Sequence, residues 1–306
     1  MKNITSNQTT LTKIRIGHSP DSDDAFMFHA TTNGKIDLEG IEFAHELHDI
    51  QTLNEWAKDA KLETTAISVH AYAHVRQHYS VLTHGASMGG ESYGPSLVVM
   101  KDKFQIPSYQ YGKDQNNQAF YDQIKNLKFG IPGEMTSAFL ALKLFLPFPL
   151  TNYKIIPFNQ IMDEVVKGTV DVGLLIHEGQ LTHESLGLTQ IANLGVWWWK
   201  KTNNLPLPLG VNVIRKNLGS EMVGKVSRIM KRSIEYALNH RSEALDYAMR
   251  YAGDMPKSLA DQFVGMYVNN WTLDLGAKGQ ESIKLFLKEA EDRGFIAKQA
   301  PVEFVS

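Results

Sequence analysis

The sequence predicts an α/β protein whose two lobes face a central ligand cleft. Short apolar segments alternate with helical patterns along most of the 306 residues, as in chains that build sheets covered by helices. A block of about 100 residues lies between two strand-like segments, 96–100 and 209–215, so the chain leaves one α/β unit and returns to it. We therefore expect a first lobe formed by residues 1–100 and 210–306, and a second lobe formed by residues 101–209.

The apolar patterns place the elements of both lobes in order. In the first lobe, strands are predicted over 13–17, 41–48, 64–69, 80–84 and 96–100, and helices over 24–34, 49–60 and 70–78. In the second lobe, strands are predicted over 127–131, 153–158 and 170–176, and helices over 135–146 and 160–168. The tryptophan run 197–199 is predicted as a strand, 101–126 as a surface excursion, and 220–293 as a helical C-terminal segment.

Composition excludes several classes of protein. Lys and Arg number 31 against 33 for Asp and Glu, so no excess of positive charge favours nucleic acid or an anionic membrane as partner. The chain has no cysteine, which excludes disulfides, thiolate metal sites and thiol nucleophiles. No apolar run approaches the roughly 20 residues of a membrane span, and the first 13 residues lack the apolar stretch of a signal peptide. We expect a cytoplasmic protein; the sequence does not predict its oligomeric state.

Three polar segments follow predicted strands and begin predicted helices. HSPDSDD follows 13–17, IPGEMTS follows 127–131, and HEGQLTHE follows 170–176. The carboxyl ends of strands border the ligand crevice in open α/β sheets, and helix N-termini there offer free N–H groups to anions. The sequence therefore predicts a cleft that binds a small carboxylated molecule.

Each of these segments also has a purely structural interpretation. Asp21, Asp23 and Asp24 could form a carboxylate cluster for acid–base chemistry or Mg²⁺, but we favour a cap in which Ser22 or Asp23 begins the helix. Thr136 and Ser137 could hold a ligand carboxylate or cap their helix, and their position in the sequence supports the two interpretations equally. His177 could be a general base or a hydrogen-bonded structural residue.

A metal site is not expected. His70, His74 and His78 recur every four residues and would share one helix face. No acidic ligand or third-ligand motif accompanies them, and a polar helix face explains the spacing. His177 and His183 are six residues apart, which does not match the zincin spacing.

Four ordered motifs resemble one enzyme family, the 1,4-dihydroxy-6-naphthoate synthases of the futalosine route to menaquinone. HSPDSDDAFMFHA is similar to that family's SPCPNDTFIF opening, and IPGEMTSA to its PGxxTTA segment. GLLIHEGQLTHESLGL is similar to its GLIIHExRxTYxxxGL segment, and NLGVWWWKKTNNLPLPLG to its DLGxWWxxxTGLPLPLG run. The resemblance covers nearly the whole chain.

The resemblance implies a fold and an activity. The fold is the two-lobed type II periplasmic-binding-protein-like fold, with a central cleft. The activity is a carbon–carbon lyase reaction that converts cyclic dehypoxanthine futalosine to 1,4-dihydroxy-6-naphthoate without metal or organic cofactor. By resemblance, His177 is the base, and the substrate-binding positions are Ser19, Asp24, Ala66, Ile67, Ser68, Thr136, Ser137 and Ala138.

The chain departs from the family pattern at charged positions. Asp21 and Asp23 are additional acidic residues, and Ala25 replaces a threonine. Ala66 stands where the family's KLS segment has lysine, and Gln180 stands where its HExRxTY segment has arginine. If all of these positions face the cleft, they weaken the binding of an anionic substrate.

Two other functions stay open. One is a non-enzymatic solute-binding protein of the same fold, which would carry a secretory or lipoprotein signal. The other is a sister menaquinone-pathway enzyme, a chorismate dehydratase. The histidine of the IHE motif and the PLPLG run favour the synthase.

Overall fold

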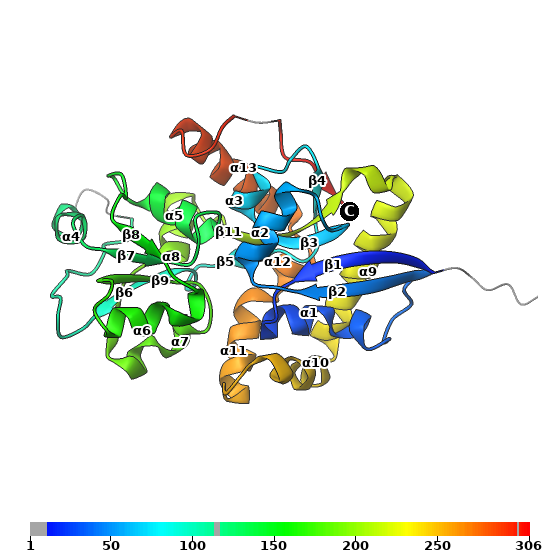
Figure 1. Ribbon diagram of the computed structural model, residues 1–306, viewed down its shortest axis with the longest axis horizontal. Helices are drawn as coiled ribbons and strands as arrows, with labels where there is room; N and C mark the ends of the chain where they lie inside the picture. The colour runs from blue at the N-terminus through cyan, green and yellow to red at the C-terminus, as the bar shows by residue number, and fades with distance from the viewer. Residues whose placement is uncertain (1–10, 113–116, 299) are drawn as a thin grey trace, which may run out of the picture.

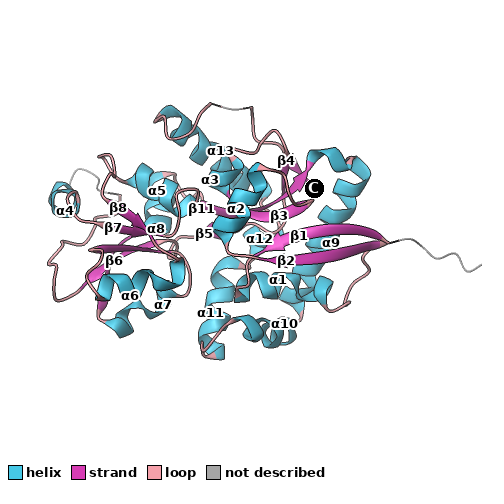
Figure 2. Ribbon diagram, viewed as in Figure 1, coloured by secondary structure: helices cyan, strands magenta, loops and turns pink. Residues whose placement is uncertain are grey.

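Two lobes, each with its own β-sheet, lie side by side in the computed structural model, which describes residues 11–112, 117–298 and 300–306 (Figure 1). Helices pack around both sheets (Figure 2). A continuous cluster of buried apolar side chains includes Ile67 and Val211 of the first sheet and Leu174 of the second. The two lobes therefore share a core where the chain passes between them.

The first sheet has seven strands in the order β12-β4-β11-β3-β1-β2, with β5 paired to β11. Its strands are β1 (Thr12–His18), β2 (Ile41–Leu47), β3 (Thr64–Ser68), β4 (Tyr79–Leu82), β5 (Ser87–Gly89), β11 (Leu207–Arg215) and β12 (Phe304–Val305). Strand β1 runs parallel to β3, whereas β11 runs antiparallel to β3 and pairs Gly210 with Ser68. The ends of β1 and β3 and the beginning of β11 therefore meet at one edge of the sheet.

The second sheet has five strands in the order β10-β6-β9-β7-β8. Its strands are β6 (Ser96–Met100), β7 (Phe129–Ile131), β8 (Tyr153–Ile155), β9 (Val172–Leu175) and β10 (Leu188–Asn193). Strand β6 pairs with β9 and β10. The segment 96–100 was assigned to the first lobe from the sequence, but its pairing places it in the second sheet, so the first crossing precedes Ser96.

The helices cover the sheets and form most of the C-terminal third. In the first lobe they are α1 (Ser22–Thr32), α2 (Ile50–Lys58), α3 (Val69–Tyr72), α9 (Ser220–Asn239), α10 (Arg241–Ala248), α11 (Lys257–Tyr267), α12 (Asn270–Leu273) and α13 (Gly276–Asp292). In the second lobe they are α4 (Gln118–Ile124), α5 (Ser137–Phe145), α6 (Ile161–Val166), α7 (Gly179–Thr182) and α8 (Leu194–Lys201). In the described part of the chain, none of them is long and apolar enough to span a membrane.

The tryptophan run forms helix α8, so the predicted strand over 197–199 is wrong. Asn193 caps this helix by accepting a hydrogen bond from the Val196 N–H at 3.1 Å. Trp198 is fully buried, and its indole Nε1 donates to Ser282 at 3.0 Å. The helix begins close to the first crossing: a Cβ on Gly195 would lie 2.0 Å from the Tyr93 carbonyl oxygen, so only glycine fits there.

The described part of the excursion 101–126 is packed onto the second lobe rather than lying free on its surface. Tyr109 and Phe120 are buried, with ring centroids 5.3 Å apart. Both rings also contact Phe145 at the end of α5. Aromatic burial of this extent fixes the segment against α5.

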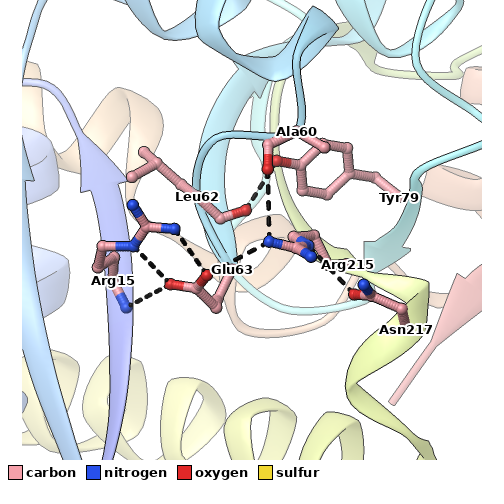
Figure 3. A network of polar contacts seen from close by, with 7 residues as sticks. All are labelled: Arg15, Ala60, Leu62, Glu63, Tyr79, Arg215 and Asn217. Atoms are coloured by element: carbon pink, nitrogen blue, oxygen red, sulfur yellow. Dashed lines mark hydrogen bonds and ion pairs between the residues drawn. The ribbon is translucent and has the colours of Figure 1, made fainter.

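A polar network joins three strands of the first sheet (Figure 3). The Arg15 side chain donates two hydrogen bonds of 2.8 Å to the Glu63 carboxylate, and Arg215 approaches the same carboxylate at 3.4 Å. Tyr79 donates to the Leu62 carbonyl at 2.7 Å. The network lies at the beginning of β3, away from the edge where β1 and β3 end.

Replacing Glu63 with glutamine is expected to lower the free energy of unfolding by about 1 kcal/mol at neutral pH. The hydrogen bonds from Arg15 hold the pKa of Glu63 below its ordinary value. The carboxylate therefore stabilises the fold above about pH 4, and this contribution disappears as the pH falls through the lowered pKa. Urea unfolding at several pH values measures the difference, with Glu221→Gln as control because that side chain is 86% exposed. An equal effect of both variants would contradict the prediction.

Candidate functional site

A cavity lies between the two lobes. Its volume is about 780 Å³, including the space where it opens to solvent. The residues that line it come from strands, helices and connecting segments of both lobes; they are Ser19, Asp23, Asp24, Ile50, Ala66, Ile67, Ser68, Gly85, Ser87, Pro95, Thr136, Ser137, Ala138, Ile176, His177, Leu209, Gly210, Val211, Asn212, Phe263 and Tyr267. All nine positions suggested from the sequence are among them. Their roles toward a ligand stay predictions.

The first lobe contributes the segments that follow β1 and end β3. Ser19 comes directly after β1, and its backbone N–H donates to Asp24 Oδ2 at 2.7 Å. Ser68 is the last residue of β3, and the fully buried Asn54 of α2 is hydrogen-bonded to both its backbone and its side chain. The Asn54 amide accepts from the Ser68 N–H at 2.8 Å and donates to the Ser68 hydroxyl at 3.1 Å.

The second lobe contributes the N-terminus of α5. Thr136 is the N-cap: its hydroxyl accepts from the Phe139 N–H at 3.2 Å, so the capping interpretation of this residue is confirmed. Ser137 and Ala138 are the first two residues of the helix, and their N–H groups have no intrahelical acceptor. Such N–H groups, next to the positive end of the helix dipole, suit a carboxylate in the cavity.

Hydrogen bonds across the lobes close one side of the cavity. The Ser137 hydroxyl donates to the Leu209 carbonyl at 2.6 Å and accepts from the His70 N–H at 3.1 Å. His70 is buried, and burial lowers the pKa of its imidazole to about 3. The neutral ring therefore serves as a lobe contact. The Ser137 hydroxyl proton is already used within the protein, which leaves its backbone N–H as the group available to a ligand.

His177 also lines the cavity, two residues after the end of β9. Its ring centroid is 4.1 Å from that of Phe158 and 6.3 Å from that of Phe263. Its Nδ1 atom is 3.6 Å from Asp21 Oδ2, which is longer than a hydrogen bond, so the two side chains approach each other across the lobes. An imidazole beside a carboxylate in the wall of a cavity suits proton transfer.

The three aspartates at the start of α1 differ in their contacts. Asp21 is the N-cap residue of α1, but its side chain makes no capping hydrogen bond, so a cap by Ser22 or Asp23 is wrong. Asp24 accepts from Ser19 as described above. Burial raises the pKa of both Asp23 and Asp24, and the nearby Asp21 carboxylate raises both further.

The lining residues that the sequence did not single out include Asn212 of β11 and Phe263 and Tyr267 of α11. The Asn212 side chain donates to the Gly85 carbonyl at 2.8 Å. Tyr267 is 4% exposed, and its hydroxyl accepts from Gln180 Nε2 of the second lobe at 2.7 Å. Helix α11 has an ordinary amphipathic pattern, so no local signal marks these side chains; the buried polar Asn212 in an apolar strand is the one usable clue.

Comparison with known proteins bears on this site. The family model described as Menaquinone biosynthesis matches residues 14–292. The 1,4-dihydroxy-6-naphtoate synthase of Thermus thermophilus is 33% identical, and the match covers 95% of this chain and 99% of that protein. The protein of the same name from Streptomyces coelicolor is 28% identical, with 94% and 96% of the two chains covered.

Solved structures agree on the fold. A protein from Archaeoglobus fulgidus superposes with a TM-score of 0.81 at 38% identity, covering 93% of this chain and 98% of that one. The alkanesulfonate-binding protein of Xanthomonas axonopodis pv. citri superposes with a TM-score of 0.70 at 9% identity, over 95% and 96% of the chains, and shares the fold alone. The two-lobed periplasmic-binding-protein-like fold expected from the sequence is thus confirmed, and the chain belongs to the menaquinone biosynthesis family.

Proposed function

We propose that the protein is a carbon–carbon lyase that forms 1,4-dihydroxy-6-naphthoate from cyclic dehypoxanthine futalosine. The observation that carries this proposal is His177 in the wall of an inter-lobe cavity, 3.6 Å from Asp21, in a chain of the menaquinone biosynthesis family. The named relatives support the product, because both are 1,4-dihydroxy-6-naphtoate synthases that match almost end to end.

In the proposed reaction, His177 Nε2 removes a hydroxyl proton from the sugar-derived part of the substrate. The oxygen electron pair forms a carbonyl group while the adjacent carbon–carbon bond breaks. The electrons of that bond move into the fused ring, which becomes the aromatic dihydroxynaphthoate. The sugar-derived fragment leaves with the new carbonyl group, and the imidazolium returns its proton to the ring oxygen that received the electron pair. These steps consist of proton and electron-pair movements and need no metal, redox or organic cofactor.

The cavity supports this chemistry through positioning. The N–H groups of Ser137 and Ala138 can donate to one oxygen atom of the substrate, and Ser68 can fix another from the other lobe. Contacts between the lobes, such as the hydrogen bond from the Ser137 hydroxyl to the Leu209 carbonyl, close one side of the cavity and help to position the substrate. We also propose that the reaction takes place in the cytoplasm on a free small-molecule substrate.

Incubation of the purified protein with cyclic dehypoxanthine futalosine tests the proposal. We expect a new product with the mass and chromatographic behaviour of 1,4-dihydroxy-6-naphthoate. Failure to form it by folded protein would refute the lyase. Binding of the substrate without turnover would favour a solute-binding protein, and dehydration of chorismate in a parallel incubation would favour the sister enzyme.

A further inference from the structure

Asp23 of α1 and Tyr267 of α11 both line the cavity. The Tyr267 hydroxyl accepts a hydrogen bond of 2.7 Å from Gln180 Nε2, which comes from the second lobe. Because the hydroxyl is the acceptor in this bond, its own proton remains free, and it makes no other hydrogen bond with the described residues. The proton is therefore available to a ligand in the cavity.

The surroundings of the Asp23 carboxyl disfavour its charge. Its Oδ1 atom is buried and has no hydrogen-bond partner among the described residues. Asp21 and Asp24 lie near it at the start of α1, and His177 of the second lobe and Tyr267 of α11 are close enough to interact with its charge. Burial, followed by the charges of Asp24 and Asp21, raises its pKa, while His177 opposes the rise. A protonated Asp23 is a hydrogen-bond donor.

No lysine or arginine is present among the described residues that line the cavity, where His177 is the single basic side chain. Neutral donors such as hydroxyl, backbone N–H and protonated carboxyl groups can hold a carboxylate ligand here, whereas an ionised aspartate at the same place would repel it.

We propose that Asp23 and Tyr267 together donate hydrogen bonds to a negatively charged oxygen of the ligand, with Gln180 holding the Tyr267 hydroxyl in place from the second lobe. The proposal deepens the proposed function, on which it rests, because that reaction acts on a carboxylated substrate. It also accounts for the two acidic departures from the family pattern: Asp21 faces His177, and Asp23 acts as a donor where the pattern has asparagine.

The proposal has a measurable consequence for pH. If the anion binds only when Asp23 is protonated, binding at a pH above the pKa of Asp23 in the free protein takes up one proton. Affinity then falls by as much as roughly tenfold for each pH unit. His177 lines the same cavity, so its contribution must be separated from that of Asp23 by substitution.

Calorimetric titration with 2-naphthoate, a stable naphthalene carboxylate, tests the proposal between about pH 6 and about pH 9. We expect the wild-type affinity to fall as the pH rises, and Asp23→Asn to remove this fall while binding as well as the wild type at the lower pH. His177→Gln should keep the fall, and uncharged 2-naphthamide should show none. No binding of 2-naphthoate by the wild type, or a fall retained in Asp23→Asn, would overturn the proposal.

The tyrosine is tested by Tyr267→Phe, which keeps the ring and removes the hydroxyl. We expect a loss of affinity of roughly tenfold at low pH, as for one hydrogen bond to a charged group. Tyr93→Phe is the matched control, since its ring packs on Tyr267 but its hydroxyl accepts from Asn269 instead of lining the cavity. Equal losses in both variants would contradict the assignment.

Gln180 is tested as a positioning residue by a double-mutant cycle. Gln180→Leu should weaken 2-naphthoate binding in the wild type but have little further effect in Tyr267→Phe, because it acts through that hydroxyl. Additive losses would refute this role. Turnover is measured separately: absence of the lyase reaction with this binding pattern intact would refute the proposed function and leave the anion site standing.

Discussion

Replacing His177 with glutamine is expected to lower kcat by about 10²–10⁴-fold while the substrate still binds. Glutamine is polar and can occupy much of the same space, but it cannot take up a proton. The imidazole is placed between Phe158 and Phe263, with Asp21 3.6 Å from Nδ1, so its Nε2 edge remains for the substrate. Single-turnover and steady-state assays of product formation measure the loss.

Two further variants separate the base from the surrounding polar groups. Asp21→Asn removes the charge beside the ring and should lower kcat by a smaller factor, roughly tenfold, with KM little changed. His183→Gln changes a buried histidine six residues along the chain, which binds the Gly179 carbonyl at 3.2 Å and does not line the cavity. Activity of His177→Gln equal to that of His183→Gln would show that another group is the base.

The positions of the cavity residues could be predicted because parallel strands end at one edge of their sheet. Ser19 follows a strand of the first sheet, and Thr136 and His177 follow strands of the second, whereas Ser68 is identified only through the family resemblance. Polar residues directly after apolar strands are a local signal, and the α/β alternation brings such segments together. The existence of each segment and its place at the cleft therefore needed no knowledge of tertiary packing.

The contribution of α11 could not be predicted in the same way. Tyr267 reaches the cavity because α11 packs beside α1, and that contact depends on the arrangement of the whole C-terminal segment. The pairing of β6 with β9 and β10 likewise joins residues far apart in the chain, and no local pattern records it.

The error at the tryptophan run has a different cause. Three consecutive large apolar residues have neither the period of a strand nor that of a helix, so the pattern did not decide between them. The deciding signal was Asn193 before the run, because its side chain caps α8 at the Val196 N–H. Capping residues should therefore outweigh β propensity where an apolar run is short.

Replacing Asn54 with alanine is expected to lower the free energy of unfolding by about 2–3 kcal/mol and to raise KM. Asn54 is fully buried and makes two hydrogen bonds to Ser68, one to its N–H and one to its hydroxyl. Alanine leaves the Ser68 N–H without its acceptor and leaves a void beneath the end of β3. Chemical unfolding and steady-state kinetics of the same preparation measure both effects.

Two control variants show whether the effect on KM comes from the position of Ser68. Asn152→Ala removes an exposed side chain that donates only a long 3.4 Å hydrogen bond to Asn126, and it should change stability by less than about 0.5 kcal/mol. Ser68→Ala keeps the backbone bond to Asn54 but removes the hydroxyl from the cavity, so it should raise KM with a smaller loss of stability. If Asn54→Ala destabilises the protein while KM stays at the wild-type value, Ser68 is a structural residue of the wall and does not hold the substrate.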